Sequence, residues 1–206
     1  MTSTALPAPP CQTDPATLRE MAADPWQHRR SVQRLQAILR EEPLAVDNEL
    51  ALRARLADEL RALGRHTEAR EVAATAVALA ASADDLPGAQ RARVQLAQLH
   101  RESGDVERAD RMFAEMLTES DQMCDLTRAF TLQHAGQNHF EQGRYEQAAP
   151  YFAAAARLRE RIGAPAEQIA QSRRYLAETH RRVGRPPEVA PTVGRRTPAP
   201  AGAVSG

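Results

Sequence analysis

The feature that most constrains this chain is a short glycine-centred pattern that recurs at intervals near 40 residues. The glycines are Gly64, Gly104, Gly143 and Gly184, separated by 40, 39 and 41 residues, and the segments around them align without gaps. A fixed period of this length indicates an array of repeated supersecondary units, each of which buries its apolar face against its neighbours. The pattern therefore predicts a repeat architecture.

The residue types around the glycines indicate that each unit is a pair of antiparallel helices. An apolar or small pair precedes each glycine: Leu56-Ala57, Leu96-Ala97, Ala135-Gly136 and Leu176-Ala177. Five residues after the first three glycines stands an alanine, and four residues further on stands Ala73, Phe113 or Phe152. Small residues allow paired helices to approach closely, and the larger ones fill the space between pairs. Glycine accommodates the positive φ that ends the first helix.

Composition agrees with helices and excludes several classes of protein. The chain is 42% hydrophobic but only 4% aromatic, its formal net charge is zero, and all 27 cationic side chains are arginine. We interpret the absence of lysine as coding bias, so the arginines carry little information about partners. No window approaches 18 apolar residues, and the first ten residues lack the features of a signal peptide. Cys11 and Cys124 suggest no disulfide framework. We expect a soluble, cytoplasmic protein.

The two ends are expected to differ from the array. Residues 1–13 are rich in Pro, Ala, Ser and Thr, which predicts a disordered leader. Asp14 and Asp24 each precede a proline, a combination typical of helix starts, so residues 14–43 are predicted to form a helical pair that caps the array. The second of these helices carries an apolar stripe formed by Val32, Leu35, Ile38 and Leu39.

Residues 44–184 are predicted to contain three repeats and a C-terminal capping helix. Pro186 and Pro187 directly follow the fourth glycine and its arginine, so a second helix cannot form there in register. Residues 185–206, rich in Pro, Gly and Ala, are predicted to be a flexible tail. The predicted fold class is all-α, a right-handed α-solenoid of antiparallel helix hairpins.

These residues resemble the tetratricopeptide repeat, whose pattern is Trp-x2-Leu-Gly-x2-Tyr followed by Ala-x3-Phe and Pro. Ala109 with Phe113 and Ala148 with Phe152 match the Ala-x3-Phe positions. The Trp position instead holds Arg53, Arg93, Leu132 and Arg173, and the Tyr position holds Leu60, His100, His139 and His180. The period exceeds the usual 34 residues, which is similar to the extended repeats of bacterial regulatory proteins and kinesin light chains.

Neither metal binding nor catalysis is predicted. His100, His139 and His180 occupy equivalent positions, but equivalent residues of stacked repeats lie about twice the 8 to 10 Å helix spacing apart, too far for a shared zinc ion. Cys124 with His134 or His139 as base is the one nucleophile that the sequence offers, and no third residue orients the pair. We therefore expect a protein that is not an enzyme and needs no cofactor.

The resemblance implies a concave groove lined by the first helix of each repeat. Carrying these positions over gives candidate peptide-binding or protein-binding residues: Arg55, Asp58, Arg91, Val94, Gln95, Gln98, Phe130, Gln133, His134, Gln137, Arg174, Tyr175 and Glu178. Amides, arginines and two aromatic rings suit an extended peptide held through backbone and carboxylate contacts. For any single residue, a solvated helix face is the alternative.

The same resemblance narrows the choice of partner. The Lys and Asn clamp of the chaperone-binding members is missing, since its positions hold Ala54, Asp58, Gln95, Phe130 and His134. We predict a non-catalytic scaffold or adaptor, with a regulatory role, that binds another protein or peptide and no chaperone tail. One alternative is a receptor for a short signalling peptide that controls a partner. Another is a nucleic-acid-associated regulator acting through the C-terminal arginines, although Tyr175 is the only aromatic among them. The oligomeric state stays open.

Overall fold

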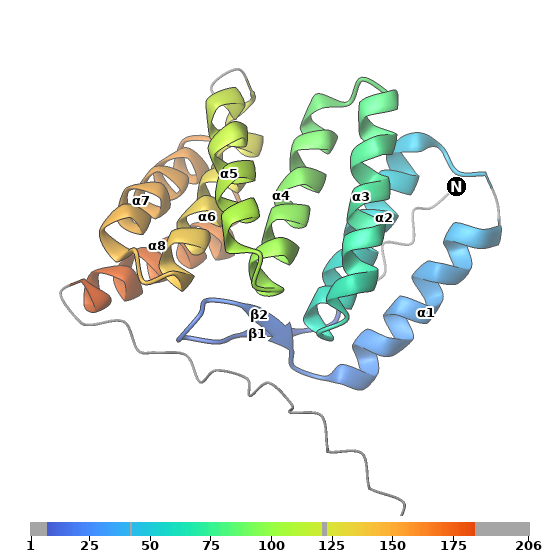
Figure 1. Ribbon diagram of the computed structural model, residues 1–206, viewed down its shortest axis with the longest axis horizontal. Coiled ribbons are helices and arrows are strands. Elements are labelled where there is room, and N and C mark those ends of the chain that lie inside the picture. The colour runs from blue at the N-terminus through green and yellow to red at the C-terminus, as the bar shows by residue number, and fades with distance from the viewer. Residues whose placement is uncertain (1–7, 42, 121–122, 184–206) are drawn as a thin grey trace, which may run out of the picture.

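The computed structural model describes residues 8–41, 43–120 and 123–183, and this part of the chain forms eight α-helices and a two-stranded antiparallel hairpin (Figure 1). The strands are β1 (Cys11–Thr13) and β2 (Glu20–Ala22). The helices are α1 (Pro25–Glu41), α2 (Val46–Ala62), α3 (His66–Ser82), α4 (Leu86–Glu102), α5 (Val106–Ser120), α6 (Asp125–Glu141), α7 (Tyr145–Arg161) and α8 (Ala166–Arg182).

The helices form the predicted array of antiparallel pairs. Helices α2 and α3, α4 and α5, and α6 and α7 are three successive pairs, α1 packs on α2, and α8 packs on α7. The first helices begin at Val46, Leu86, Asp125 and Ala166, at the same intervals as the glycines. The all-α solenoid is confirmed, with the small hairpin as an addition to it.

The turns within the pairs depend on the recurring glycines. Gly64, Gly104 and Gly143 have φ values of 73°, 88° and 71°, a region in which a Cβ atom is strained. Each glycine stands two residues after the last residue of a first helix, in the turn where the sequence predicts it. Gly184 and the prolines after it lie outside the described residues.

The small residues of the repeat lie where the paired helices meet. Ala69, Ala109 and Ala148 are fully buried, and Phe113 and Phe152, four residues after the last two, are buried as well. Their burial agrees with the predicted repeat register. One small alanine side chain in each repeat therefore allows its two helices to pack closely.

Gly136, on α6, gives a direct test of this packing. A Cβ atom added there would lie 2.8 Å from Phe152 Cε1, a ring that is itself fully buried. We expect Gly136→Ala to destabilise the protein by about 1–2 kcal/mol, because overpacking outweighs the gain of about 1 kcal/mol in helix propensity. Chemical denaturation measures the change. The reverse change at the equivalent exposed position, Ala177→Gly, should cost only the propensity term, and a Gly136→Ala variant as stable as the parent would contradict the predicted contact.

The N-terminal segment differs from the predicted helical pair. Asp14 does cap a turn, since its Oδ1 atom accepts a hydrogen bond from the Ala16 amide and its carbonyl accepts one from Leu18 N. The turn stops there, because Leu18 adopts a left-handed φ of 59° and the chain reverses into β2. The prediction of a helix at Asp14 is therefore wrong.

The remaining N-terminal predictions have mixed outcomes. Residues 8–13, predicted as part of a disordered leader, include strand β1, whose Cys11 pairs with Ala22 of β2. The predicted helix start at Asp24 is correct, because Oδ1 of that residue accepts hydrogen bonds from the first amides of α1. Residues 1–7 and the tail 185–206 lie outside the described residues.

Candidate functional site

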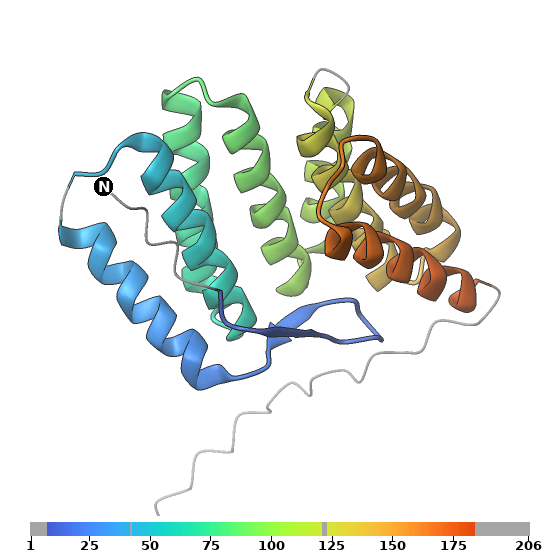
Figure 2. The ribbon, with the colours of Figure 1, turned by 180° about the vertical axis from the view of Figure 1, so that it is seen from behind.

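The hairpin lies in a groove lined by helices α2, α4, α6 and α8 (Figure 2). It extends from the start of α1 toward α8, so that a segment near the N-terminus contacts the last described helix of the array. An extended segment of the chain itself thus occupies the surface at which the sequence predicts a peptide.

Leu18, at the turn of the hairpin, provides the apolar part of this contact. Its side chain is 3% exposed and packs in a cluster with Phe140, Phe152 and Tyr175. Its carbonyl oxygen accepts hydrogen bonds from Gln137 Nε2 at 3.0 Å and from the Tyr175 hydroxyl at 3.4 Å. The groove thus holds both the side chain and the backbone of this residue, which offsets the strain of its left-handed conformation.

Arg19 and Glu20 complete a closed series of alternating charges, which we call the ion ring. In order around the ring its members are Glu20, Arg61, Glu102, Arg101, Glu141 and Arg19. The five successive contacts measure 3.6, 3.3, 3.5, 3.0 and 2.6 Å. Because its first and last members are neighbours on the hairpin, the ring joins the hairpin to α2, α4 and α6.

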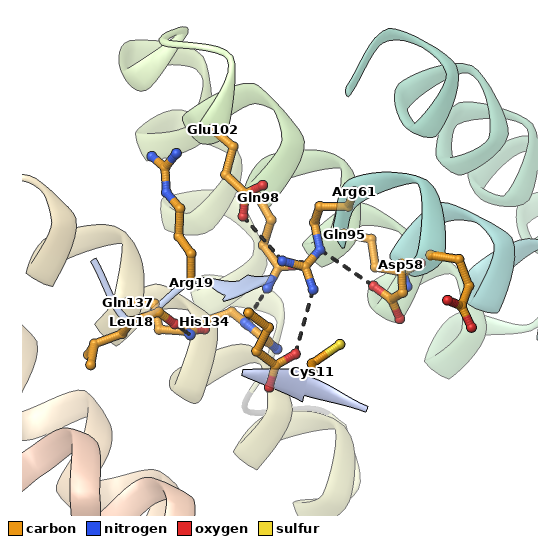
Figure 3. Close-up of polar contacts among 12 residues, drawn as sticks. Cys11, Leu18, Arg19, Asp58, Arg61, Gln95, Gln98, Glu102, His134 and Gln137 are labelled. Atoms are coloured by element: carbon orange, nitrogen blue, oxygen red, sulfur yellow. Dashed lines mark hydrogen bonds and ion pairs between the residues drawn. The ribbon is translucent and has the colours of Figure 1, made fainter. Parts of the chain in front are cut away.

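Arg61 is the branching point of these contacts. Figure 3 shows its guanidinium group between Asp58 on its own helix and Glu102 on α4. Three carboxylates surround it once Glu20 of the hairpin is included, and their charges raise the pKa of Arg61 above its ordinary value despite burial. This arginine therefore remains charged in the groove.

A cavity of about 230 Å³ lies beneath the hairpin. Its walls come from four helices of the groove, from α7 and from β2, and consist mainly of arginines and amides. The lining residues are Glu20, Asp58, Arg61, Gln98, Arg101, Phe130, Gln133, His134, Gln137, Arg159, Gln168 and Gln171. Such a wall binds polar groups through directed hydrogen bonds.

The pKa of His134 is affected by the positive charges around this cavity. Burial holds its pKa well below the usual range, and the charges of Arg101, Arg61 and Arg159 lower it further. The ring is therefore neutral near pH 7, and its Nδ1 atom lies in hydrogen-bond contact with the Gln98 amide. The guanidinium groups of three helices, α2, α4 and α7, thus all lower the pKa of this one histidine.

A second buried contact fixes the segment that precedes β1. His28 of α1 is 1% exposed, and its Nδ1 atom lies 2.5 Å from Glu59 Oε2 on α2. Its Nε2 atom lies 3.1 Å from the carbonyl oxygen of Pro10. The imidazole therefore links α1, α2 and the residue that directly precedes β1.

The structure brings together only some of the candidate groove residues. Six of them line the cavity beneath the hairpin: Asp58, Gln98, Phe130, Gln133, His134 and Gln137. Three others line an adjoining hollow against the hairpin: Arg174, Tyr175 and Glu178. The binding role of all nine stays a prediction.

The other four candidates lie elsewhere. Gln95 donates a hydrogen bond to the Ala54 carbonyl and so joins α4 to α2. Arg55 and Arg91 line two separate hollows. The assignment of Val94 to the groove surface is wrong, because this side chain is fully buried in the core with Phe113 and Met116.

The charged residues of the ion ring and Arg159 are not among the candidate residues predicted from the sequence. A signal for part of the ring was available, because Arg61 and Arg101 both stand three residues before a recurring glycine. Glu102 and Glu141 both stand two residues before one. These positions fall at the ends of first helices, beyond the stretch carried over from the family pattern.

The described residues contain no cluster of three His, Cys, Asp or Glu side chains that could hold a metal ion. Cys124 is exposed at the start of α6, and its sulfur contacts the hydroxyl of Thr127, not a histidine. Within the same residues, no helix is long and apolar enough to cross a bilayer.

The two cysteines are expected to differ in reactivity. Hydrogen bonding with Thr127 lowers the pKa of Cys124, whereas burial and the charge of Glu20 raise the pKa of Cys11. Because the thiolate is the reactive form, Cys124 should react with an aromatic disulfide reagent several-fold faster than Cys11 at pH 8. Reaction rates measured on the Cys11→Ser and Cys124→Ser variants test this. The two cysteines should react at equal rates in guanidinium, where the protein is unfolded. Equal rates in the folded protein would contradict the prediction.

Comparison with known proteins finds a family match for one repeat and similar folds among solved structures. Residues 131–162 match the model of the tetratricopeptide repeat. The fold is similar to the nearly identical TPR-like repeats described for a kinesin light chain of Podosopora anserina, with 18% identity and a TM-score of 0.53 over 77% of this chain and 80% of that chain. A single-residue variant of that protein gives a TM-score of 0.54 at the same identity and coverage. Among curated proteins, no sequence matches significantly.

The fold and its groove define an α-solenoid of the class that generally mediates contacts between proteins. The match at residues 131–162, which span most of α6 and α7, agrees with the resemblance to the tetratricopeptide repeat inferred from the glycine pattern.

Proposed function

We propose that this protein is a non-catalytic scaffold with a regulatory role, which binds an extended segment of another protein or a peptide in the groove of α2, α4, α6 and α8. The observation that carries the proposal is the hairpin itself. Its Leu18 is bound through side chain and carbonyl, and its neighbours Arg19 and Glu20 are bound through ion pairs. Backbone hydrogen bonds combined with pockets for side chains are a general means by which proteins hold extended peptides.

The test compares a groove with the hairpin in place and a groove from which it has been released. The full-length parent and its Leu18→Asp variant are immobilised and exposed to extract from the source organism, and retained proteins are identified by mass spectrometry. Each identified protein is then purified and its binding measured directly. We expect tighter binding to the variant, because the segment that fills the groove no longer competes.

A groove-defective variant provides the control. Adding Gln137→Ala and Tyr175→Phe to Leu18→Asp removes the two hydrogen-bond donors that hold the Leu18 carbonyl. Binding should fall with these changes and persist with Arg91→Ala, which alters an exposed arginine outside the cavity. Retention of the same partners by the groove-defective variant would contradict a groove scaffold, as would turnover of a small substrate.

A receptor for a short signalling peptide is the second candidate, and the ion ring favours it. A peptide that takes the place of the hairpin must open the ring at Arg19 and Glu20, so binding would change the links between α2, α4 and α6. For a receptor we expect peptide binding to change the radius of gyration in X-ray scattering. Binding of a folded protein with no response to any peptide would exclude this candidate.

A further inference from the structure

Arg159 is a buried cation without a carboxylate partner among the described residues. Its side chain comes from α7, the residue is 6% exposed, and its Nη1 atom donates to Gln168 O at 2.8 Å, Ser172 Oγ at 2.7 Å and Gln133 Oε1 at 3.4 Å. All three acceptors are neutral. Burying a charge against neutral groups is unfavourable, and an ion pair would partly offset that cost, so packing alone does not account for this arginine.

Three side chains of the cavity wall carry buried nitrogen atoms without hydrogen-bond partners in the described part of the chain. These atoms are Arg61 Nε, Arg101 Nε, Arg101 Nη1 and Gln133 Nε2, and the first two lie near carboxylates of the ion pairs described above. Among the buried acceptor atoms of the same wall, only Gln137 Oε1 lacks a hydrogen bond of good geometry within the described residues, and its side chain interacts with the His134 ring. Buried donors are normally satisfied, so the excess of donors points to an acceptor ligand.

The charges indicate which acceptor fits. Arg61 and Arg101 are already paired within the ion ring, which leaves the single positive charge of Arg159 to be matched. One carboxylate supplies one negative charge and two oxygen atoms for a planar guanidinium group. A phosphate would bring additional charge close to Asp58 and Glu20, which also line the cavity.

The hairpin shows that a carboxylate reaches this cavity. Glu20 lies in its wall, where Oε1 accepts a hydrogen bond from Gln171 at 3.0 Å and Oε2 lies 3.6 Å from Arg61. Its contact with Arg61 is long for an ion pair, and it makes none with Arg159 in the structure. Glu20 therefore occupies the edge of the cavity.

We propose that the cavity beneath the hairpin is a carboxylate-binding site, in which Arg159, Arg101 and Gln133 recognise an acidic group of the segment bound in the groove. In the free protein the negative charge of Glu20, at the edge of the cavity, opposes the entry of a second carboxylate. The inference rests on the proposed scaffold function and names the chemistry of its ligand, a peptide with an acidic side chain or terminus. A free small carboxylate presents the same chemistry, so the experiment separates the two sources.

The first arm uses glutarate as the free carboxylate and isothermal titration calorimetry as the measurement. Glu20→Gln in the full chain should bind glutarate at least tenfold more tightly than the parent, because the competing carboxylate is gone. Adding Arg159→Gln should abolish that gain, whereas Arg173→Gln, an exposed arginine of α8 paired with Glu160, should leave it unchanged. Inorganic phosphate binding as tightly as glutarate would overturn the assignment.

The second arm uses a capped peptide with the sequence Leu-Arg-Glu-Met-Ala, which is that of residues 18–22, and the same peptide with Gln in place of Glu. The receiving protein is the full chain carrying Leu18→Asp and Glu20→Gln, so that its own hairpin does not compete. We expect at least tenfold tighter binding of the Glu peptide. Because the peptide is not tethered as the hairpin is, its carboxylate can move from the edge position of Glu20 to Arg159. Arg159→Gln should therefore remove this preference while preserving affinity for the Gln peptide, which shows that the groove is still folded.

The outcomes separate the two proposals. Preference for the Glu peptide without glutarate binding would assign the site to a carboxylate carried by a partner. Glutarate binding that depends on Arg159, with no peptide or protein bound, would support the site and contradict the scaffold. Equal affinity for the two peptides, unchanged by Arg159→Gln, would overturn the carboxylate site and leave the scaffold standing.

Discussion

Replacing Leu18 by Asp is expected to release the hairpin from the groove and leave the helical array folded. Burial of a leucine side chain contributes about 1.5–3 kcal/mol, and the variant also places a charge against Phe140, Phe152 and Tyr175. The docking equilibrium should therefore shift by at least about 100-fold, since each 1.4 kcal/mol is a factor of ten. Asp tolerates a left-handed φ better than Leu does, so lost packing, not backbone strain, is the cause.

Hydrogen exchange measured by mass spectrometry distinguishes release of the hairpin from global unfolding. Amides of β1 and β2 should exchange much faster in the variant, while those of α4, α6 and α7 keep their protection. Cys11, on β1, should become more reactive, with little change at Cys124. Met21→Asp is the matched control, because Met21 is on the same hairpin but is 43% exposed. Unchanged protection of the strands in Leu18→Asp would show that the apolar contact does not hold the hairpin.

The helical array was predictable because its determinants are local and repeated. Gly64, Gly104 and Gly143 end their helices through their own backbone conformation, and the alanines five residues later pack within the same helix pair. The residues that determine each helical hairpin therefore lie within about 15 positions of one another in the sequence. The same logic located α1 from Asp24 and the proline after it.

The hairpin was not predictable, because its determinants are distant in the chain. Asp14 and Pro15 give a valid helix-start signal, and one turn does form. Its continuation is prevented at Leu18, which is held by Gln137 and Tyr175, residues more than 100 positions away. Tertiary contacts thus override a local propensity, and no local pattern reveals them.

The candidate site was recovered in part for a related reason. Positions carried over from the first helices include Gln133, His134 and Gln137, which line the cavity, and their binding role stays a prediction. They could not reveal Arg159, which reaches the same cavity from the second helix of its repeat. Val94 was misplaced because α4 has buried polar and apolar residues on several of its faces. The sequence pattern of such a helix does not show which face lines the groove.

Glu141→Gln is expected to have the largest effect on the ion ring. The carboxylate is 5% exposed and pairs with Arg101 at 3.0 Å and with Arg19 at 2.6 Å. Removing one member of a buried pair costs about 3–5 kcal/mol, because the remaining charge is left uncompensated. Arg101, with a side chain 2% exposed, keeps only a 3.5 Å contact with Glu102. Chemical denaturation measures the loss, and Glu119→Gln, whose exposed pair with Arg93 should contribute less than about 1 kcal/mol, is the control.

A double-mutant cycle then divides this loss between the hairpin and the array. If Arg19 and Glu141 interact as the structure shows, Arg19→Gln and Glu141→Gln together should cost less than the sum of the single changes. The coupling with Arg19 should vanish in the Leu18→Asp background, because the released hairpin carries Arg19 away from α6. Coupling between Arg101 and Glu141 should persist there, since both belong to the array. Persistence of the Arg19 coupling would mean that this ion pair holds the hairpin without Leu18, and that a partner must displace the charges before the apolar contact.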